Sequence, residues 1–105
     1  MTEERRVAPR FKRQLQVSIG ELRLETTNVS ESGLQLVCPE LWLRRLKRAM
    51  DNERIDLVIR VGADLDTKVR GRVAYISEAG DEYLIGVAFE RFDGDGEAAW
   101  KALCR

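Results

Sequence analysis

The sequence contains no histidine, only two cysteines and no long hydrophobic run, and each shortage excludes a class of function. Without histidine there is no Ser-His-Asp triad and no His-containing zinc site, and the commonest general base is missing. Cys38 and Cys104 form no CxxC pair, so we expect two free thiols in a reducing compartment. No apolar segment approaches the roughly 18 residues of a membrane-spanning helix. The start, "MTEERR", has no secretory signal, so we expect a cytoplasmic protein without membrane insertion.

Charge is balanced overall but unevenly distributed along the chain. The 105 residues carry 18 basic and 18 acidic side chains, and a net charge of zero argues against a general nucleic-acid coat. Residues 1–13 hold five basic and two acidic side chains, whereas the chain from Glu78 onward holds seven acidic and three basic ones. A basic arm on a neutral body indicates a local anion site.

Alternation of apolar and polar residues predicts six short strands. "QLQVSI" is the first, and Gly20-Glu21 suits a type II′ hairpin turn into a second strand that begins at Leu22. "LQLVC" is the third. The apolar positions of the last three strands are Ile55, Leu57, Ile59 and Val61, then Val69, Gly71, Val73 and Tyr75, and then Tyr83, Ile85, Val87 and Phe89. This pattern favours a small antiparallel barrel or sandwich.

Two segments have helical spacing instead. Residues 40–52, after Pro39, predict a short amphipathic helix with Leu41, Leu43, Leu46, Ala49 and Met50 on its apolar side and Arg44, Arg45, Lys47 and Arg48 in solvent. "GDGEAAWKALC" predicts a terminal helix capped by Asp95 or Gly96, with Ala99, Trp100 and Leu103 on one face. The terminal helix could cover an open end of a barrel.

Two short motifs flank the first two strands. "RRVAPR" places Arg5, Arg6 and Arg10 just before the first strand, and "NVSESG", residues 28–33, joins the second strand to the third. Taken singly, the first could be a solubilising tail and the second an ordinary Asx-type turn. Both motifs together arise by chance on the order of once in two hundred such chains.

With the late "LIGVAF" strand and the closing helix, these motifs resemble the PilZ domain family from about Arg5 to the C-terminus. The insert at about 40–52 departs from the family, and Asn28 stands where Asp is commoner. The resemblance implies a mainly all-β fold: a six-stranded antiparallel β-barrel with a C-terminal helix and a short helical insert between strands three and four. Residues 1–13 would be a flexible basic arm, and residues 14–105 the barrel domain with its helix.

The resemblance also implies binding of cyclic di-GMP, without catalysis, cofactor or metal. Arginine suits this ligand because its guanidinium pairs bidentately with phosphate or with the N7/O6 edge of guanine, and it can stack on a base. Arg5, Arg6 and Arg10 are therefore expected to clamp the ligand. In the family, an arginine before the RxxxR core goes with two stacked ligand molecules, so Arg5 predicts two.

The barrel would contribute the second motif. The Asn28 amide offers a donor and an acceptor to a guanine edge, and the Ser30 hydroxyl can bond to phosphate or base. Gly33 permits either a positive φ or the close approach of another group.

No second domain with an output is recognisable in the sequence, so we expect a receptor-adaptor that orders its arm on binding and signals to an unidentified effector protein. The resemblance suggests motility, polysaccharide or biofilm control.

Three alternatives remain. A barrel for single-stranded RNA or DNA would need surface aromatics and a basic groove, yet most aromatics here fall at core positions, so no DNA or RNA is expected. An enzyme could use Asp64, Asp66, Asp93 and Asp95 at DxD spacing, although such pairs are common in turns. The third is a PilZ-fold interaction scaffold without ligand, against which the intact motifs argue.

Overall fold

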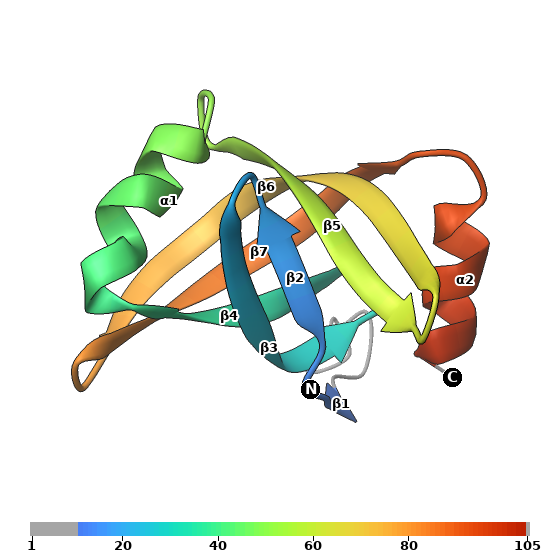
Figure 1. The fold of residues 1–105 in the computed structure, drawn as a ribbon, viewed down its shortest axis with the longest axis horizontal. Helices are drawn as coiled ribbons and strands as arrows, with labels where there is room; N and C mark the ends of the chain where they lie inside the picture. Colours follow the sequence, from blue (N-terminus) through green and yellow to red (C-terminus); the bar gives the residue numbers. More distant parts are fainter. Residues whose placement is uncertain (1–10, 105) are drawn as a thin grey trace, which may run out of the picture.

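A six-stranded antiparallel barrel, as expected, forms the body of the protein (Figure 1). The structure is a computed structural model and describes residues 11–104, without the side chain of Phe11. The strands form one sheet in the order β1-β3-β2-β5-β6-β7-β4, and pairing of β3 with β4 closes the barrel. They are β1 (Phe11–Lys12), β2 (Gln16–Ile19), β3 (Leu22–Ser30), β4 (Gly33–Pro39), β5 (Arg54–Gly62), β6 (Leu65–Ala79) and β7 (Glu82–Phe92). The two-residue β1 is an addition that pairs only with β3.

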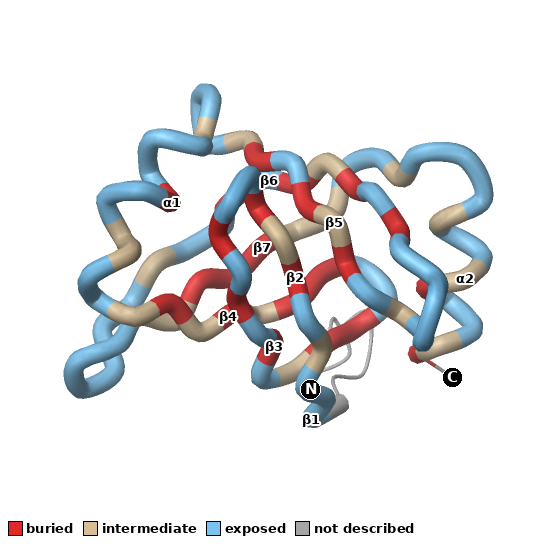
Figure 2. Tube along the Cα trace, in the orientation of Figure 1, coloured by how far each residue is buried: buried red, intermediate tan, exposed pale blue. Residues whose placement is uncertain are grey.

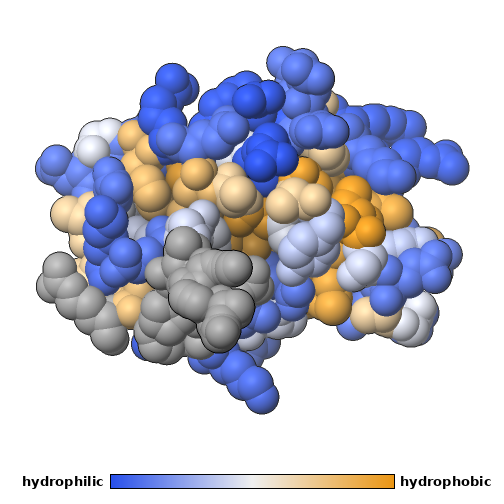
Figure 3. Space-filling model, turned by 180° about the vertical axis from the view of Figure 1, so that it is seen from behind, coloured by the Kyte–Doolittle hydropathy of each residue, from blue (hydrophilic) through white to orange (hydrophobic). Residues whose placement is uncertain are grey.

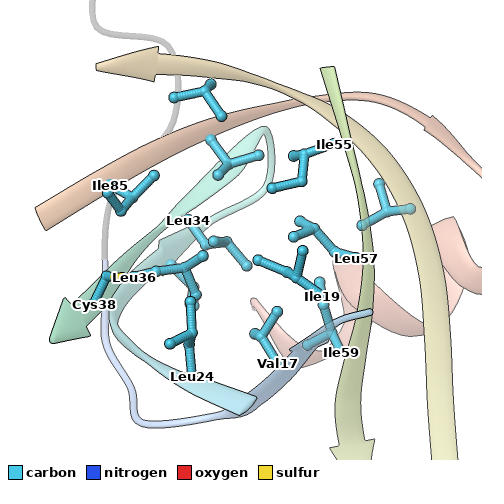
Figure 4. Packing of buried hydrophobic residues seen from close by; sticks show 14 of the residues in the cluster. Val17, Ile19, Leu24, Leu34, Leu36, Cys38, Ile55, Leu57, Ile59 and Ile85 are labelled. Carbon is cyan, nitrogen blue, oxygen red and sulfur yellow. The ribbon is translucent and has the colours of Figure 1, made fainter. Parts of the chain in front are cut away.

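Buried and exposed residues alternate along much of the strands (Figure 2), and the buried aliphatic side chains fill the barrel. Figure 4 shows Leu36, Ile59 and Ile85 from three different strands turned towards the same interior. Gly20, with φ of 60°, makes the tight turn predicted between β2 and β3. The core is therefore packed, and a ligand site must lie on the outside.

The terminal helix α2 (Gly96–Leu103) lies against β6 and β5 at one end of the barrel (Figure 1). Trp100 is completely buried and packs edge-to-face on Phe89, with ring centroids 5.2 Å apart. Its Nε1 donates a 2.8 Å hydrogen bond to the Ser30 carbonyl. Asp95 precedes the helix as predicted but makes no side-chain capping bond. Within residues 11–104, neither helix is long and apolar enough to cross a membrane.

The predicted insert helix exists, but its apolar face is narrower than the sequence suggests. It consists of a 3-10 turn, η2 (Glu40–Trp42), followed by α1 (Leu43–Ala49). Leu46 is buried, whereas Leu41 is 89% exposed and Ala49 is exposed. A 3-10 turn has three residues per turn rather than 3.6, which shifts Leu41 off the face that α1 buries. The four basic side chains of α1 are exposed, as predicted.

Strand β6 contains a bulge that corrects the predicted alternation. Tyr75 was expected to share the inner face with Val73, but a register shift between these residues inserts Ala74. Tyr75 therefore pairs with Gly86 on the outer face, and Ile76 takes the inner position opposite Ile85.

Candidate functional site

The "NVSESG" motif is mostly strand and only partly turn. Asn28 and Ser30 belong to β3, the turn is residues 31–32, and Gly33 begins β4. Asn28 lies outside that turn, because it pairs with Gln35 across the β3–β4 hairpin. Ser30 is only 7% exposed, and its Oγ donates a long 3.4 Å hydrogen bond to the Gly33 carbonyl.

Gly33 is required for space and not for its backbone angle. It is absent from the positive-φ glycines of the described chain, which are Gly20, Gly80 and Gly94. A Cβ at Gly33 would lie 2.3 Å from the Val87 carbonyl oxygen. Gly33 is therefore explained by the close approach of the Val87 carbonyl and not by a positive φ.

A shallow hollow of about 110 Å³ opens beside the motif, on the outer wall made by β4, β7 and β6. This wall lies behind β2 and β5 in Figure 1 and faces the viewer in Figure 3, where hydrophobic surface crosses its middle below hydrophilic groups. Its floor consists largely of small residues, because Gly33 pairs with Ala88 and Gly86 lies two residue pairs further along, on the same face of the sheet. The hollow is lined by Ser30, Ser32, Gly33, Leu34, Ala74, Tyr75, Gly86, Val87 and Ala88. The "LIGVAF" segment thus directs Gly86 and Ala88 outwards to leave this space.

A hydrogen-bond network joins Asn28 to the rim of the hollow. Gln35 Oε1 accepts bonds from Asn28 Nδ2 (3.2 Å) and from Thr27 Oγ1 (2.8 Å), and Gln35 Nε2 donates to the Tyr75 hydroxyl. The Tyr75 ring covers Gly86 so closely that a Cβ there would come within 2.1 Å of a ring carbon. Tyr75 is still 38% exposed and presents an aromatic surface beside the hollow.

Arg72 adds a positive charge on the same outer wall. It pairs with Ala88, which in turn pairs with Gly33, so the three residues form one row across β6, β7 and β4. Its guanidinium is exposed and has no hydrogen bond or ion pair with any residue between 11 and 104. Sequence reasoning missed Tyr75, Gln35 and Arg72, since only the strand register brings them next to the motif.

The chain that follows the arginine motif is fastened beside Asn28. In β1, Phe11 pairs with Val29 and Lys12 with Asn28. The Thr26 hydroxyl, in a side chain only 2% exposed, accepts a 2.8 Å bond from the Leu15 amide and donates to the Arg13 carbonyl. Followed backwards from Lys12, β1 therefore leads towards the Ser30 end of β3.

The arginines themselves, Arg5, Arg6 and Arg10, lie outside the described residues, as does most of the predicted arm, residues 1–13. The flexibility of that arm and its boundary at residue 13 stay predictions.

The aspartates and cysteines considered for catalysis or metal binding do not line the hollow. Asp66 forms a 3.2 Å ion pair with Arg60, and Asp64 lies in the turn that precedes it. No cluster of metal-ligating side chains occurs in the described part of the chain. Cys38 and Cys104 are buried, and burial raises the pKa of both thiols. A raised pKa keeps a thiol protonated, the opposite of what a reactive cysteine needs.

The barrel interior is packed, so the space beside the motif is a polar and aromatic hollow on the outer wall. The PilZ domain model matches residues 2–105, and the chain therefore belongs to the PilZ domain family. Members of this family are ligand-binding receptor or adaptor domains rather than enzymes.

A solved structure has the same fold. The Bacillus subtilis inhibitor of motility, MotI/DgrA, superposes with a TM-score of 0.74 over 95% of this chain at 18% identity. The chain spans about half of that protein, 49% of its length. At this identity the similarity shows the fold alone. No curated protein matches the sequence significantly.

Proposed function

We propose that this protein is a cytoplasmic receptor for cyclic di-GMP that alters its surface on binding and thereby signals to a partner protein. One observation carries the proposal: β1 fastens the chain directly after the RRxxxR motif to β3 at Asn28, the first residue of the NxSxxG motif. Phe11, the residue after the arginine motif, lies opposite Val29 inside the second motif, which supports a binding site shared by the two motifs. Membership of the PilZ family supports the choice of ligand.

The shape of the site suggests how the ligand is held. The hollow, at about 110 Å³, is well below the 300–1,000 Å³ of pockets that enclose small molecules. A cyclic dinucleotide would therefore lie across the outer wall and be covered from the opposite side by Arg5, Arg6 and Arg10. Closing the arm brings like charges together, and the dianion relieves their repulsion. Ligand binding should therefore order the arm and create a new surface for the partner.

The barrel side offers complementary chemistry. Asn28 presents an amide to a guanine edge, and Ser30 lines the hollow into which a phosphate or base edge would reach. Tyr75 supplies an aromatic face on which a base can stack, a contact worth about 1–3 kcal/mol per base. Arg72, without an ion-pair partner in the described chain, can bind phosphate or the guanine N7/O6 edge.

We further propose that two stacked ligand molecules bind and that Arg5 holds the second. The effector is a protein not yet identified. The fold shared with an inhibitor of motility supports motility as the controlled process, beside polysaccharide and biofilm formation.

Titration calorimetry with cyclic di-GMP tests the proposal, with cyclic di-AMP and an oligonucleotide as competing ligands. The parent should bind only cyclic di-GMP, with a ligand-to-protein ratio near two. Arg6→Ala and Arg10→Ala should each remove charge-assisted bonds of about 1.5–3 kcal/mol, which lowers affinity by one to two decades, at an unchanged melting temperature.

Arg91→Ala, an exposed arginine on β7 that does not line the hollow, is the matched control and should bind like the parent. Absence of cyclic di-GMP binding by the parent would refute the proposed receptor function. Arg5→Leu should halve the ratio, and a parent ratio of one would refute the stacked pair alone.

A further inference from the structure

The insert helix carries a dense positive charge that the ligand site does not use. Arg44, Arg45, Lys47 and Arg48 are all exposed on α1, and none forms an ion pair with a described residue. The helix is anchored from behind by Leu46, which is completely buried. Positive charge without an ion-pair partner on the outer side of this helix is available to an anionic partner.

Two of these arginines border a groove. An open groove of about 470 Å³ runs between α1 and the β2–β3 hairpin and is lined by Ile19, Gly20, Glu21, Leu22, Arg45, Arg48 and Ala49. Ile19 and Leu22, which are 2% and 7% exposed, form its floor, and the two guanidinium groups outnumber the one carboxylate in the lining, that of Glu21. The groove has room for a peptide segment with apolar side chains flanked by carboxylates, because arginine pairs bidentately with carboxylate.

Acidic residues around the β6–β7 turn favour a peptide segment as the partner of α1 over a membrane surface. The β6–β7 turn and α1 lie at the same end of the molecule, opposite α2 (Figure 1). Around that turn, Glu78, Asp81 and Glu82 are all exposed. A broad anionic membrane approaching α1 would also meet these carboxylates, whereas a single peptide segment in the groove would not.

We propose that the groove between α1 and the β2–β3 hairpin is a docking site for an acidic, partly apolar segment of a partner protein. The groove lies outside the hollow described above and shares no lining residue with it. Docking there needs no cyclic di-GMP, so the measurement is made without ligand and does not depend on the receptor function.

The test is fluorescence anisotropy with a fluorescein-labelled peptide of Glu-Glu-Leu repeats at about 50 mM salt, where the Debye length exceeds 10 Å. The parent should bind this peptide and not its Gln-Gln-Leu analogue. Arg45→Glu combined with Arg48→Glu should weaken binding at least tenfold, and about 300 mM salt should weaken parent binding similarly.

The matched control, Lys68→Glu with Arg91→Glu, makes the same charge change at exposed positions of β6 and β7 and should lose less than threefold. Circular dichroism should show both double variants folded, since all four side chains are exposed. Equal binding of the Gln-Gln-Leu peptide, or equal losses in both double variants, would overturn the site. Binding to phosphatidylglycerol vesicles without binding to the acidic peptide would overturn it in favour of a membrane.

Discussion

The contact between Tyr75 and Gly86 predicts that Gly86→Ala destabilises the protein when the Tyr75 ring is present and stabilises it when the ring is removed. The three atoms nearest to a Cβ added at Gly86 would all belong to the Tyr75 ring, at 2.1–2.6 Å, where carbon atoms normally stay about 3.5–4.0 Å apart. Gly86→Ala must therefore push the ring away. Because the ring is 38% exposed it can move, but it then loses its hydrogen bond with Gln35, worth about 0.5–1.5 kcal/mol, and its packing on the strand.

We expect Gly86→Ala to destabilise the parent by about 1–2 kcal/mol. In a Tyr75→Ala background the added methyl group meets no ring, and alanine gains about 0.5–1 kcal/mol over glycine within a strand. The same substitution should then stabilise, so the coupling energy of the pair is about 2 kcal/mol. Tyr75→Phe is the control, because it keeps the ring and removes only the hydroxyl bond.

Urea unfolding of the four proteins, followed by tryptophan fluorescence, measures this coupling directly. If Gly86→Ala has the same effect with and without the tyrosine ring, Tyr75 does not cover Gly86 and the aromatic rim of the hollow is misassigned.

Thr26→Val keeps the side-chain volume but removes the hydroxyl that ties the segment after β1, at Arg13 and Leu15, to β3. Urea unfolding should therefore show a loss of about 1–3 kcal/mol, and calorimetry a weaker cyclic di-GMP affinity. Trp100→Phe leaves the buried Ser30 carbonyl without its donor, which should lower the melting temperature by several degrees. Cys38 and Cys104 should react with a thiol reagent far more slowly in the native than in the urea-unfolded protein. Since their folded pKa is raised, the stability they contribute is present at neutral pH and lost at alkaline pH.

The barrel could be predicted because each strand buries one face. Alternating apolar residues such as Val17 and Ile19 therefore identify the inner face. Alternation fails where a strand gains a residue, and the bulge at Ala74 moved Tyr75 from the predicted core to the outer wall. It also cannot distinguish a 3-10 turn from an α-helix, which left Leu41 in solvent.

The candidate site was predictable only where its residues are close in sequence. Asn28, Ser30 and Gly33 form a local motif, whereas their neighbours Gln35 and Tyr75 are set by pairing between distant strands. Thr26 has no signature at all, since a buried threonine in a strand looks ordinary until its two backbone partners are known.

The pairing of β1 with β3 fixes where the chain after Arg10 meets the barrel, to within one residue. Because Phe11 pairs with Val29, the number of residues between the arginines and the barrel is fixed by this register. In extended chain, successive side chains alternate sides and advance by about 3.3 Å. In an arm that is extended, one residue inserted between Arg10 and Phe11 would turn the arginines to the opposite side. Two inserted residues would restore their side but set them about 7 Å further out. Binding should thus depend on the parity of the insertion more than on its length.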